Sequence, residues 1–495
     1  MSAAVPNDLV VALDVGTSSV RALLYDGRAR PLPGAGAHVP YRPRIDRDGA
    51  AEVDADRLIG LVGGCLDELL RRARPVLTGP VGAVGVSTFW HSLVATDTEG
   101  RALTPLFLWA DTRSRRAAEE LAGRLDPEAV RRRTGCTLHA SYWPARLAWL
   151  KRVRPDLWRR PVRWLSFGDL LYWRLFGHPA TSLSMASGTG LFRLEDRSWD
   201  EELLAALDVD PARLPPLAEV ESGLAPEFAA RWPQLARATW LHAAGDGALA
   251  NLGSGCVDPT QRALTVGTSG ALRAMCSELP APPPPGLWCY RLDAERLVVG
   301  GALSNGGNLQ DWMSQVLNLD RPRLQEQLRQ RRPGAHGLVF LPLLAGERSL
   351  GYAPHAFGAV AGLTLATTAE DIAQAGLEAI AIEFARVDRR LDEVLPAPRR
   401  LVASGAALLG SPSWMQVMAD AIGRPVAAGR AEEASSRGAA LFALERLRPD
   451  QAPPAEPGVT ATFEPDEAAH RAYEGMRRRQ EALYEVLVAR RPPDA

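Results

Sequence analysis

The stretch VVALDVGTSSVRALLYD, residues 10–26, decides how this chain folds. Two apolar runs, 10–13 and 20–25, flank a short turn of small residues, and this pattern predicts a β-hairpin. Backbone N–H groups in such a turn, together with its Thr and Ser hydroxyls, can form a nest that binds an anion. A tight turn selected only for its backbone freedom is the alternative.

A second stretch repeats this pattern about half a chain later. LTVGTSGALRAM (264–275) matches LDVGTSSVRALL (13–24) in an apolar strand, the tetrapeptide Val-Gly-Thr-Ser and a second apolar strand. The match predicts two similar domains, with a chance coincidence as the alternative. Two such turns could grip a polyphosphate, and the carboxylate of Asp14, just before the first turn, could hold a divalent cation.

Composition limits the class of protein. The chain has 495 residues, which predicts about two to four domains. With 57 Lys+Arg against 58 Asp+Glu, it has no overall attraction to nucleic acid or to an anionic membrane. We find no signal-peptide pattern and no bilayer-length apolar run, and we expect a cytosolic protein. The 5 scattered cysteines lack a C-x-x-C pair, which predicts reduced thiols.

Lysine is almost absent from the chain. Lys151 is the only one, and nearly all basic charge is arginine. A Walker-type phosphate loop needs a lysine after its glycines, and no such motif exists here. If the protein binds nucleotide phosphates, it must use another device.

Strands and helices alternate along the chain, which predicts the α/β class. Short apolar strands end in polar loops at 81–90, 104–114 and 238–255. Helices are predicted over 56–72, 369–394, 411–425 and 464–490, from amphipathic spacing and from caps such as Thr368 and Ser411.

Several segments, in this order, resemble the signature blocks of the FGGY carbohydrate kinases, a family of the actin-like ATPase superfamily. They are ALDVGTSSVRALLYD (12–26), GDGALANLGSG (245–255), ALTVGTSGALRAM (263–275), GGALSNGGNLQDWM (300–313), LLAGERS (343–349) and ASGAALLGSPSWMQVMADAIGRPV (403–426). The resemblance extends over nearly the whole chain. Within the family, TFWHSLVATDTEG (88–100) with TPLFLWADTRS (104–114), and LSMASGTGLF (183–192) with SWDEELL (198–204), are most similar to gluconokinases.

The resemblance implies an α/β fold of two ribonuclease-H-like domains around a central cleft. The expected division is 1–247 for a sugar-binding and catalytic domain, 248–450 for a nucleotide-binding domain and 451–495 for a helical tail. The expected partners are a small sugar or sugar acid, without nucleic acid or membrane, and a homodimer is left open.

The implied activity is transfer of the γ-phosphoryl group of ATP, with Mg²⁺, to a hydroxyl of a small sugar acid. D-Gluconate is the expected acceptor. A ketopentose such as xylulose, or another polyol, is the alternative acceptor. An actin-like ATP-binding regulatory protein that phosphorylates no sugar is the alternative from a different class.

The resemblance also assigns individual residues. Asp246 matches the catalytic base, and Asp14 is the expected metal ligand. The substrate-binding residues are expected to be His91, Trp90, Trp109, Asp111, Arg113 and Tyr142, together with Asp246. The nucleotide-binding residues are expected to be Gly16, Thr17, Ser18, Gly267, Thr268, Ser269, Gly307, Gly405 and Ala406.

Some positions differ from the family pattern or allow a second interpretation. Ala406 stands where relatives commonly have a second glycine, and its methyl group could hold the nucleotide further from the backbone. Trp90 is bulkier than the residue expected beside His91. Arg113 could face a substrate carboxylate, or Asp111 and Arg113 could simply pair with each other.

Overall fold

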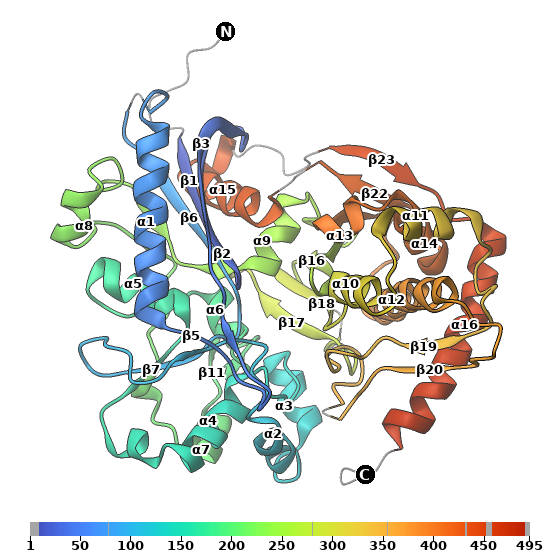
Figure 1. Ribbon diagram of the computed structural model, residues 1–495. Helices are drawn as coiled ribbons and strands as arrows, with labels where there is room; N and C mark the ends of the chain where they lie inside the picture. The colour runs from blue at the N-terminus through green and yellow to red at the C-terminus, as the bar shows by residue number, and fades with distance from the viewer. Residues whose placement is uncertain are drawn as a thin grey trace. The chain divides into compact units, whose positions relative to one another are not determined.

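The computed structural model describes residues 9–77, 79–279, 281–353, 355–430, 433–451 and 458–490. It contains two compact units, each assembled from separate stretches of chain (Figure 1). The first unit comprises Met1–Gly255, Cys289–Leu297 and Glu433–Ala455, and the second comprises Cys256–Trp288, Val298–Glu432 and Glu456–Ala495.

The first unit is built on a mixed sheet with the strand order β12-β13-β6-β1-β2-β3, in which β14 also pairs with β6. The strands are β1 (Val10–Val15), β2 (Ser19–Tyr25), β3 (Pro31–Pro40), β6 (Ala83–Thr88), β12 (Val220–Glu221), β13 (Thr239–Leu241) and β14 (Ala244–Gly245). Strands β1 and β2 form the predicted antiparallel hairpin, and β1 runs parallel to β6. Every residue of β1 is buried, because both faces of this central strand are covered.

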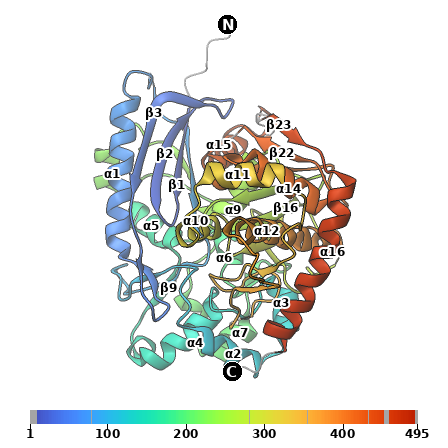
Figure 2. The same ribbon diagram turned by 45° about the vertical axis from the view of Figure 1, so that its right-hand side comes forward.

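Helices cover the two faces of this sheet. Helix α1 (Ala55–Ala73) packs on β2 and β3, and Figure 2 shows α1 beside these strands. Helix α15 (Ala434–Leu447) packs on β1 and β6. Helix α15 also packs against α9 (Asp246–Gly253). Glycines allow these close approaches: a Cβ on Gly85 would be 2.1 Å from the carbonyl oxygen of Ala439 in α15.

The second unit repeats this arrangement. Its sheet contains the strand order β18-β16-β15-β21-β22-β23. The strands are β15 (Gln261–Val266), β16 (Gly270–Cys276), β18 (Leu297–Leu303), β21 (Arg400–Ser404), β22 (Val426–Gly429) and β23 (Val459–Phe463). Again the first two strands form an antiparallel hairpin, and the first runs parallel to the next strand of the sheet, β21. The α/β class and the structural repeat predicted from the sequence are therefore confirmed.

The two hairpins differ by one residue at the turn. In the first, Val15 is opposite Val20, which centres the turn on Thr17 and Ser18. In the second, Val266 is opposite Gly270, which centres the turn on Thr268 alone. The sequence match could not reveal this difference, because it aligns residues and not hydrogen bonds.

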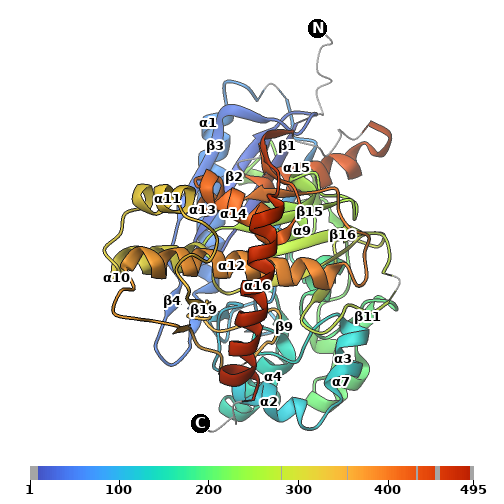
Figure 3. The ribbon, with the colours of Figure 1, turned by 90° about the vertical axis from the view of Figure 1, so that its right-hand side faces the viewer.

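The long helices of the second unit begin and end as their sequences indicate. Thr368 and Asp371 form a capping box at the start of α12 (Ala369–Leu391). The Ser411 side chain accepts a hydrogen bond from the N–H of Trp414 at the start of α14 (Pro412–Ile422), which stops before the left-handed Gly423. Helix α16 (Glu467–Tyr484) packs on α12 and α14. Figure 3 shows α16 in front of these two helices.

The other strands and α-helices of the chain have the following bounds. The strands are β4 (Arg44–Ile45), β5 (Ala51–Val53), β7 (Val94–Thr96), β8 (Leu106–Phe107), β9 (Arg163–Leu165), β10 (Phe192–Arg193), β11 (Ser198–Trp199), β17 (Trp288–Arg291), β19 (Val339–Leu341) and β20 (Ala359–Ala361). The α-helices are α2 (Arg115–Ala122), α3 (Pro127–Thr134), α4 (Trp143–Val153), α5 (Phe167–Phe176), α6 (Leu183–Ser187), α7 (Glu201–Leu207), α8 (Pro226–Arg231), α10 (Gly307–Val316), α11 (Arg321–Gln330) and α13 (Ala406–Leu409).

The division into units differs from the boundaries expected at residues 247 and 450. Helix α15 was expected in the second domain, but its small residues pack in the first unit, where a Cβ on Gly438 would be 1.8 Å from the carbonyl oxygen of Leu249. Helix α16 was expected in a separate tail, and it belongs to the second unit. Within the described parts of the chain, no helix combines the length and apolar character that crossing a membrane requires.

Candidate active site

Two carboxylates of the first unit stand at the same edge of its sheet. Strands β1 and β14 lie on either side of β6 and run parallel to it, and Ser87 of β6 is level with both Asp14 and Ala244. Asp246 follows β14 as the first residue of α9, with Gly245 as its N-cap. Parallel strands thus bring Asp14 and Asp246 to one edge, although 231 positions separate them in the sequence, as their numbers show.

Charged groups surround this edge. The Ser87 hydroxyl donates to Asp14 at 2.6 Å, and Arg21 lies 3.9 Å from Asp14 and 3.4 Å from Glu433. Burial raises the pKa of Asp14 to about 6, and the negative charge of Asp246 acts in the same direction. A buried carboxylate next to a second one is short of positive charge, which a divalent cation would supply.

The turn of the first hairpin is held by Tyr41. The Tyr41 hydroxyl donates to the carbonyl of Gly16 at 2.6 Å, and the Tyr41 N–H donates to the carbonyl of Ser18 at 2.8 Å. The Gly16 N–H closes the turn on the carbonyl of Ser19 at 2.9 Å. Thr17 is half-buried and Ser18 is exposed, so the centre of the turn is rigid and accessible.

The second unit brings together most of the residues expected to bind nucleotide. The N–H groups of Gly307 and Asn308, at the start of α10, donate to the carbonyls of Gly267 and Thr268 at 2.8 and 3.0 Å. A Cβ on Gly405 would be 2.4 Å from the carbonyl oxygen of Val266, and φ of Gly405 is +92°, so this position requires glycine. Ala406 follows as the first residue of α13, with its side chain exposed.

The bulk of Trp90 has a structural explanation. A Cβ on Gly188 would be 2.4 Å from Cδ1 of the indole, and a Cβ on Gly245 would be 1.8 Å from Cε2. The ring therefore lies between two glycines that leave room for it. Ser184 of α6 links the pieces, because its carbonyl accepts from Trp90 Nε1 at 2.9 Å and its hydroxyl accepts from the Gly245 N–H at 3.0 Å.

His91 and Tyr142 lie together beside Trp90. The His91 and Tyr142 rings are 4.9 Å apart at 77°, and His91 Nδ1 is 2.5 Å from the carbonyl oxygen of Gly188. The buried guanidinium of Arg146 donates to the backbone carbonyls of His91 and Leu108. Arg146 therefore joins the segment that carries His91 to the loop that carries Trp109, which is half-buried.

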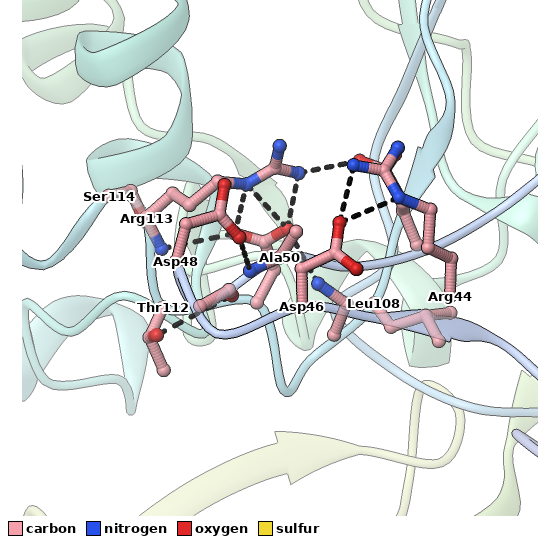
Figure 4. Close-up of polar contacts among 12 residues, drawn as sticks. Arg44, Asp46, Asp48, Ala50, Leu108, Thr112, Arg113 and Ser114 are labelled. Carbon is pink, nitrogen blue, oxygen red and sulfur yellow. Dashed lines mark hydrogen bonds and ion pairs between the residues drawn. The ribbon is translucent and has the colours of Figure 1, made fainter.

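Asp111 and Arg113 pair with each other, as the alternative interpretation of the sequence proposed. Arg113 Nη2 is 2.6 Å from Asp111 and 2.7 Å from Glu52. Arg44 contacts Glu52 and Asp46, both at 2.5 Å. Figure 4 shows the guanidinium groups of Arg113 and Arg44 among these contacts. Two arginines thus meet three carboxylates in this cluster.

Comparison with known proteins gives the family. Residues 9–253 match the FGGY family of carbohydrate kinases, N-terminal domain, and residues 263–445 match its C-terminal domain. The chain belongs to the FGGY family of carbohydrate kinases. The resemblance noted in the sequence is therefore confirmed, and the fold of this FGGY kinase is shared with solved structures. A ligand-bound xylulose kinase from Lactobacillus acidophilus has a TM-score of 0.89 at 24% identity, over 97% of this chain and 98% of that one.

The names of the relatives refer to different phosphoryl acceptors. Gluconokinase from Bacillus subtilis (strain 168) is 27% identical over 451 residues, which cover 88% of this chain and 87% of the relative. Glycerol kinase from Aromatoleum aromaticum is 31% identical over 458 residues, which cover 88% of this chain and 89% of the relative. The family membership of this kinase is clear, whereas its acceptor has to be argued from the site.

Sequence reasoning missed several residues of this site. Arg21 had a local signal, because a hairpin with this turn places it opposite Asp14. No local sequence signal indicated Glu433 or Arg146, since long stretches of sequence separate them from the residues they contact. The carboxylates of Asp14 and Asp246 fit Mg²⁺, because one or two carboxylates are its usual protein ligands.

Proposed function

We propose that this FGGY kinase transfers the γ-phosphoryl group of ATP to a hydroxyl of a small sugar acid, with D-gluconate as acceptor and a 6-phosphate as product. One observation carries the proposed chemistry: the parallel strands β1, β6 and β14 bring Asp14 and Asp246, the first residue of α9, to the same edge of the sheet. The choice of gluconate is supported by the gluconokinase relative and by the quoted blocks at 88–114 and 183–204.

We propose Asp246 as the general base. A carboxylate within reach of the acceptor hydroxyl can take its proton as the new O–P bond forms. The position of Asp246 is well defined, because Gly247 N–H donates to Asp246 Oδ1 at 2.7 Å and the Ser435 hydroxyl donates to its backbone carbonyl at 3.4 Å. Phosphoryl transfer mainly requires positioning and charge neutralisation, so this one base suffices.

Asp14 is the residue that we propose to hold Mg²⁺. When bound, Mg²⁺ would neutralise charge on the transferring phosphate. The chain's own part is to keep a carboxylate at the strand edge: Ser87 orients Asp14, and Arg21 offsets part of the negative charge of Asp14 and Glu433.

The two hairpin turns are the proposed phosphate contacts, through Gly16, Thr17 and Ser18 in one unit and Gly267, Thr268 and Ser269 in the other. Gly307 supports this role, because it begins a helix against the second turn and the positive end of a helix attracts anions. Gly405 and Ala406 are the proposed contacts to adenosine. The exposed methyl group of Ala406 stays compatible with nucleotide binding but limits how closely the nucleotide approaches.

For the acceptor we propose His91, Trp90, Trp109 and Tyr142 as the lining of the site. We propose that Asp111 and Arg113 support the acceptor site without touching the acceptor. Since Arg113 is already held by Asp111 and Glu52, its task is to fix the loop after Trp109.

A second acceptor class has one specific observation in its favour. The cluster of Arg44, Arg113, Asp46, Glu52 and Asp111 contains more carboxylates than guanidinium groups. A net negative cluster disfavours a carboxylate placed beside it. An uncharged ketose such as xylulose, or another polyol, is therefore the second candidate.

A coupled assay of ADP release, with Mg·ATP and one acceptor at a time, tests the proposal. D-Gluconate, D-xylulose, D-ribulose, glycerol and no acceptor are compared by kcat/KM. The proposal expects gluconate to give the highest value. A higher value for xylulose would replace the acceptor and keep the chemistry, whereas hydrolysis that ignores every acceptor would overturn the kinase mechanism.

A further inference from the structure

His91 lies in a group of aromatic rings drawn from distant parts of the sequence. We name Trp90, His91, Tyr142 and Tyr290 the His91 ring cluster; all four belong to the first unit. The ring of Tyr290 is 5.4 Å from that of His91 at 67° and 4.8 Å from that of Trp90 at 60°. These are edge-to-face and tilted contacts, the geometry that aromatic rings prefer.

A pair of hydroxyls closes the cluster on one side. The hydroxyl oxygens of Tyr142 and Tyr290 are 2.6 Å apart, and both residues are 1% exposed. The backbone holds Tyr290 on either side, because the Cys289 N–H donates to the carbonyl of Gly135 at 2.9 Å and the Arg291 N–H donates to the Ser187 hydroxyl at 2.9 Å. Tyr290 is therefore a fixed point against which Tyr142 is held.

The His91 ring has a defined tautomer in this arrangement. Nδ1 lies 2.5 Å from the carbonyl oxygen of Gly188, and a carbonyl oxygen can only accept, so Nδ1 carries the proton. In the neutral ring Nε2 is then a hydrogen-bond acceptor. The backbone of His91 has φ of +66°, a conformation that few non-glycine residues adopt, so its surroundings must hold it in place.

We propose that Tyr290 is a positioning residue of the acceptor site: through its hydroxyl contact with Tyr142 it holds the cluster that keeps the His91 ring in place with Nδ1 protonated towards Gly188. The inference rests on the proposed function, because it takes His91 as a contact to a hydroxyl of the acceptor. Tyr290 lies on β17, far in sequence from the quoted sugar-site blocks, and no resemblance noted in the sequence assigns it a role.

The variant Tyr290→Phe removes one hydroxyl and keeps the ring. We expect KM for D-gluconate, or for the acceptor that the wild type phosphorylates best, to rise about 10-fold, because a less well fixed His91 binds the acceptor less well. We expect kcat and KM for ATP to change by less than about 2-fold, since Asp246 and the nucleotide residues are untouched.

Tyr172→Phe is the matched control. The Tyr172 hydroxyl is also buried in the first unit and donates to the carbonyl of Leu241, while its ring stacks on His242 at 4.2 Å. A purely structural cost of losing a buried hydroxyl should affect both variants alike. Equal acceptor KM values for Tyr290→Phe and Tyr172→Phe would overturn the proposal.

A spectroscopic measurement separates this inference from the proposed function. In ¹⁵N-histidine-labelled protein, the signal of His91 is assigned by its loss in His91→Gln, and its nitrogen shifts report which nitrogen is protonated. We expect the Nδ1-protonated form in the wild type and a mixture in Tyr290→Phe. The Nε2-protonated form in the wild type, or an unchanged His91 signal in the variant, would overturn the inference even if no acceptor were phosphorylated. If Tyr290→Phe does not fold, Tyr142→Phe removes the other hydroxyl and takes its place in this measurement.

Discussion

The indole of Trp90 occupies the space that a side chain at position 245 would need, since a Cβ on Gly245 would stand 1.8 Å from Cε2 of the ring. Gly245 is the N-cap of α9, and Asp246 is the first residue of that helix. The large residue at position 90 and the missing side chain at position 245 therefore belong to one arrangement. The position of the proposed base depends on it.

Gly245→Ala tests this dependence. The added methyl group must displace either the indole or the start of α9, and overpacking of this kind costs about 1–3 kcal/mol of unfolding free energy. Because displacing a catalytic group by about 1 Å can cost roughly 100-fold in rate, we expect kcat to fall by about that factor. Steady-state kinetics and thermal unfolding measure the two effects.

Gly60→Ala is the matched control for Gly245→Ala. Gly60 lies in α1, and no heavy atom would come within 4 Å of its Cβ. This change should stabilise the protein by about 0.5–1 kcal/mol and leave kcat unchanged. A Gly245→Ala enzyme with the kcat of the wild type would contradict the link between Trp90 and Asp246.

Asp246→Asn tests the proposed base directly. The amide keeps the size of the side chain but cannot take a proton, so we expect kcat to fall by about 10²- to 10⁴-fold. Binding of Mg·ATP, measured by calorimetry, should stay within a few-fold of the wild type. Asp258→Asn, at an exposed aspartate that accepts from the Thr260 N–H at 2.7 Å, is the control and should retain full turnover. Undiminished turnover by Asp246→Asn would remove Asp246 from the mechanism.

Local sequence patterns predicted the parts of this fold that depend on neighbours along the chain. The hairpin at Val10–Tyr25 follows from two apolar runs around a small-residue turn, and helix α14 follows from Ser411, Pro412 and Gly423 at its ends. The grouping of Gly267, Gly307 and Gly405 was inferred from the family resemblance. The structure explains Gly307 and Gly405, because a Cβ on either would be 2.6 or 2.4 Å from a backbone carbonyl oxygen of the second unit, whereas a Cβ on Gly267 would meet no heavy atom within 4 Å.

Other features depend on contacts between distant segments, and no local pattern could indicate them. Tyr290 reaches the His91 ring cluster on a strand that returns from the second half of the chain, and α15 packs in the first unit through Gly438 and Ala439. The pairing of Arg113 with Glu52 was likewise out of reach, since β5 and the loop after Trp109 meet only in the folded sheet. Local sequence predicts individual helices and strands, whereas packing decides which distant segments contact one another.

A buried ion cluster in the second unit leads to a stability prediction. The Arg262 side chain is 0% exposed and contacts Asp388 at 2.5 Å and Asp392 at 2.8 Å, while Arg424 contacts Asp388 at 2.7 Å. Asp388→Ala would leave the Arg262 guanidinium without its nearest partner, and breaking a buried pair in this way costs about 3–5 kcal/mol. We expect the unfolding temperature to fall by about 10 °C.

An exposed ion pair of the same unit is the control for Asp388→Ala. Arg389 and Glu474 are 2.6 Å apart with side chains that are 54% and 21% exposed. Arg389→Ala should cost less than about 1 kcal/mol, because solvent screens the pair. Equal unfolding temperatures for the two variants would mean that the Arg262 cluster adds no more than a surface pair.

The buried carboxyl of Asp169 should make stability depend on pH in an uncommon direction. Burial raises the pKa of Asp169 from 3.8 to about 6. Its carboxylate accepts from the Ser166 N–H at 2.7 Å, within the capping box of α5. Between these two pKa values the folded state holds a proton that the unfolded state has released. The contribution of Asp169 is therefore fully present below about pH 4 and is lost as the pH rises through about 6.

Asp169→Asn should remove this dependence, because the amide stays neutral and can still accept from the Ser166 N–H. At pH 7 we expect the variant to be more stable than the wild type by up to about 3 kcal/mol, with the difference shrinking towards zero at pH 4. Denaturant unfolding at both pH values measures it. Asp97→Asn should behave in the opposite way, since hydrogen bonds from Arg101 lower the pKa of Asp97 and its contribution is lost as the pH falls. A stability difference between Asp169→Asn and the wild type that stays constant from pH 4 to 7 would show that Asp169 is ionised in the folded protein throughout this range.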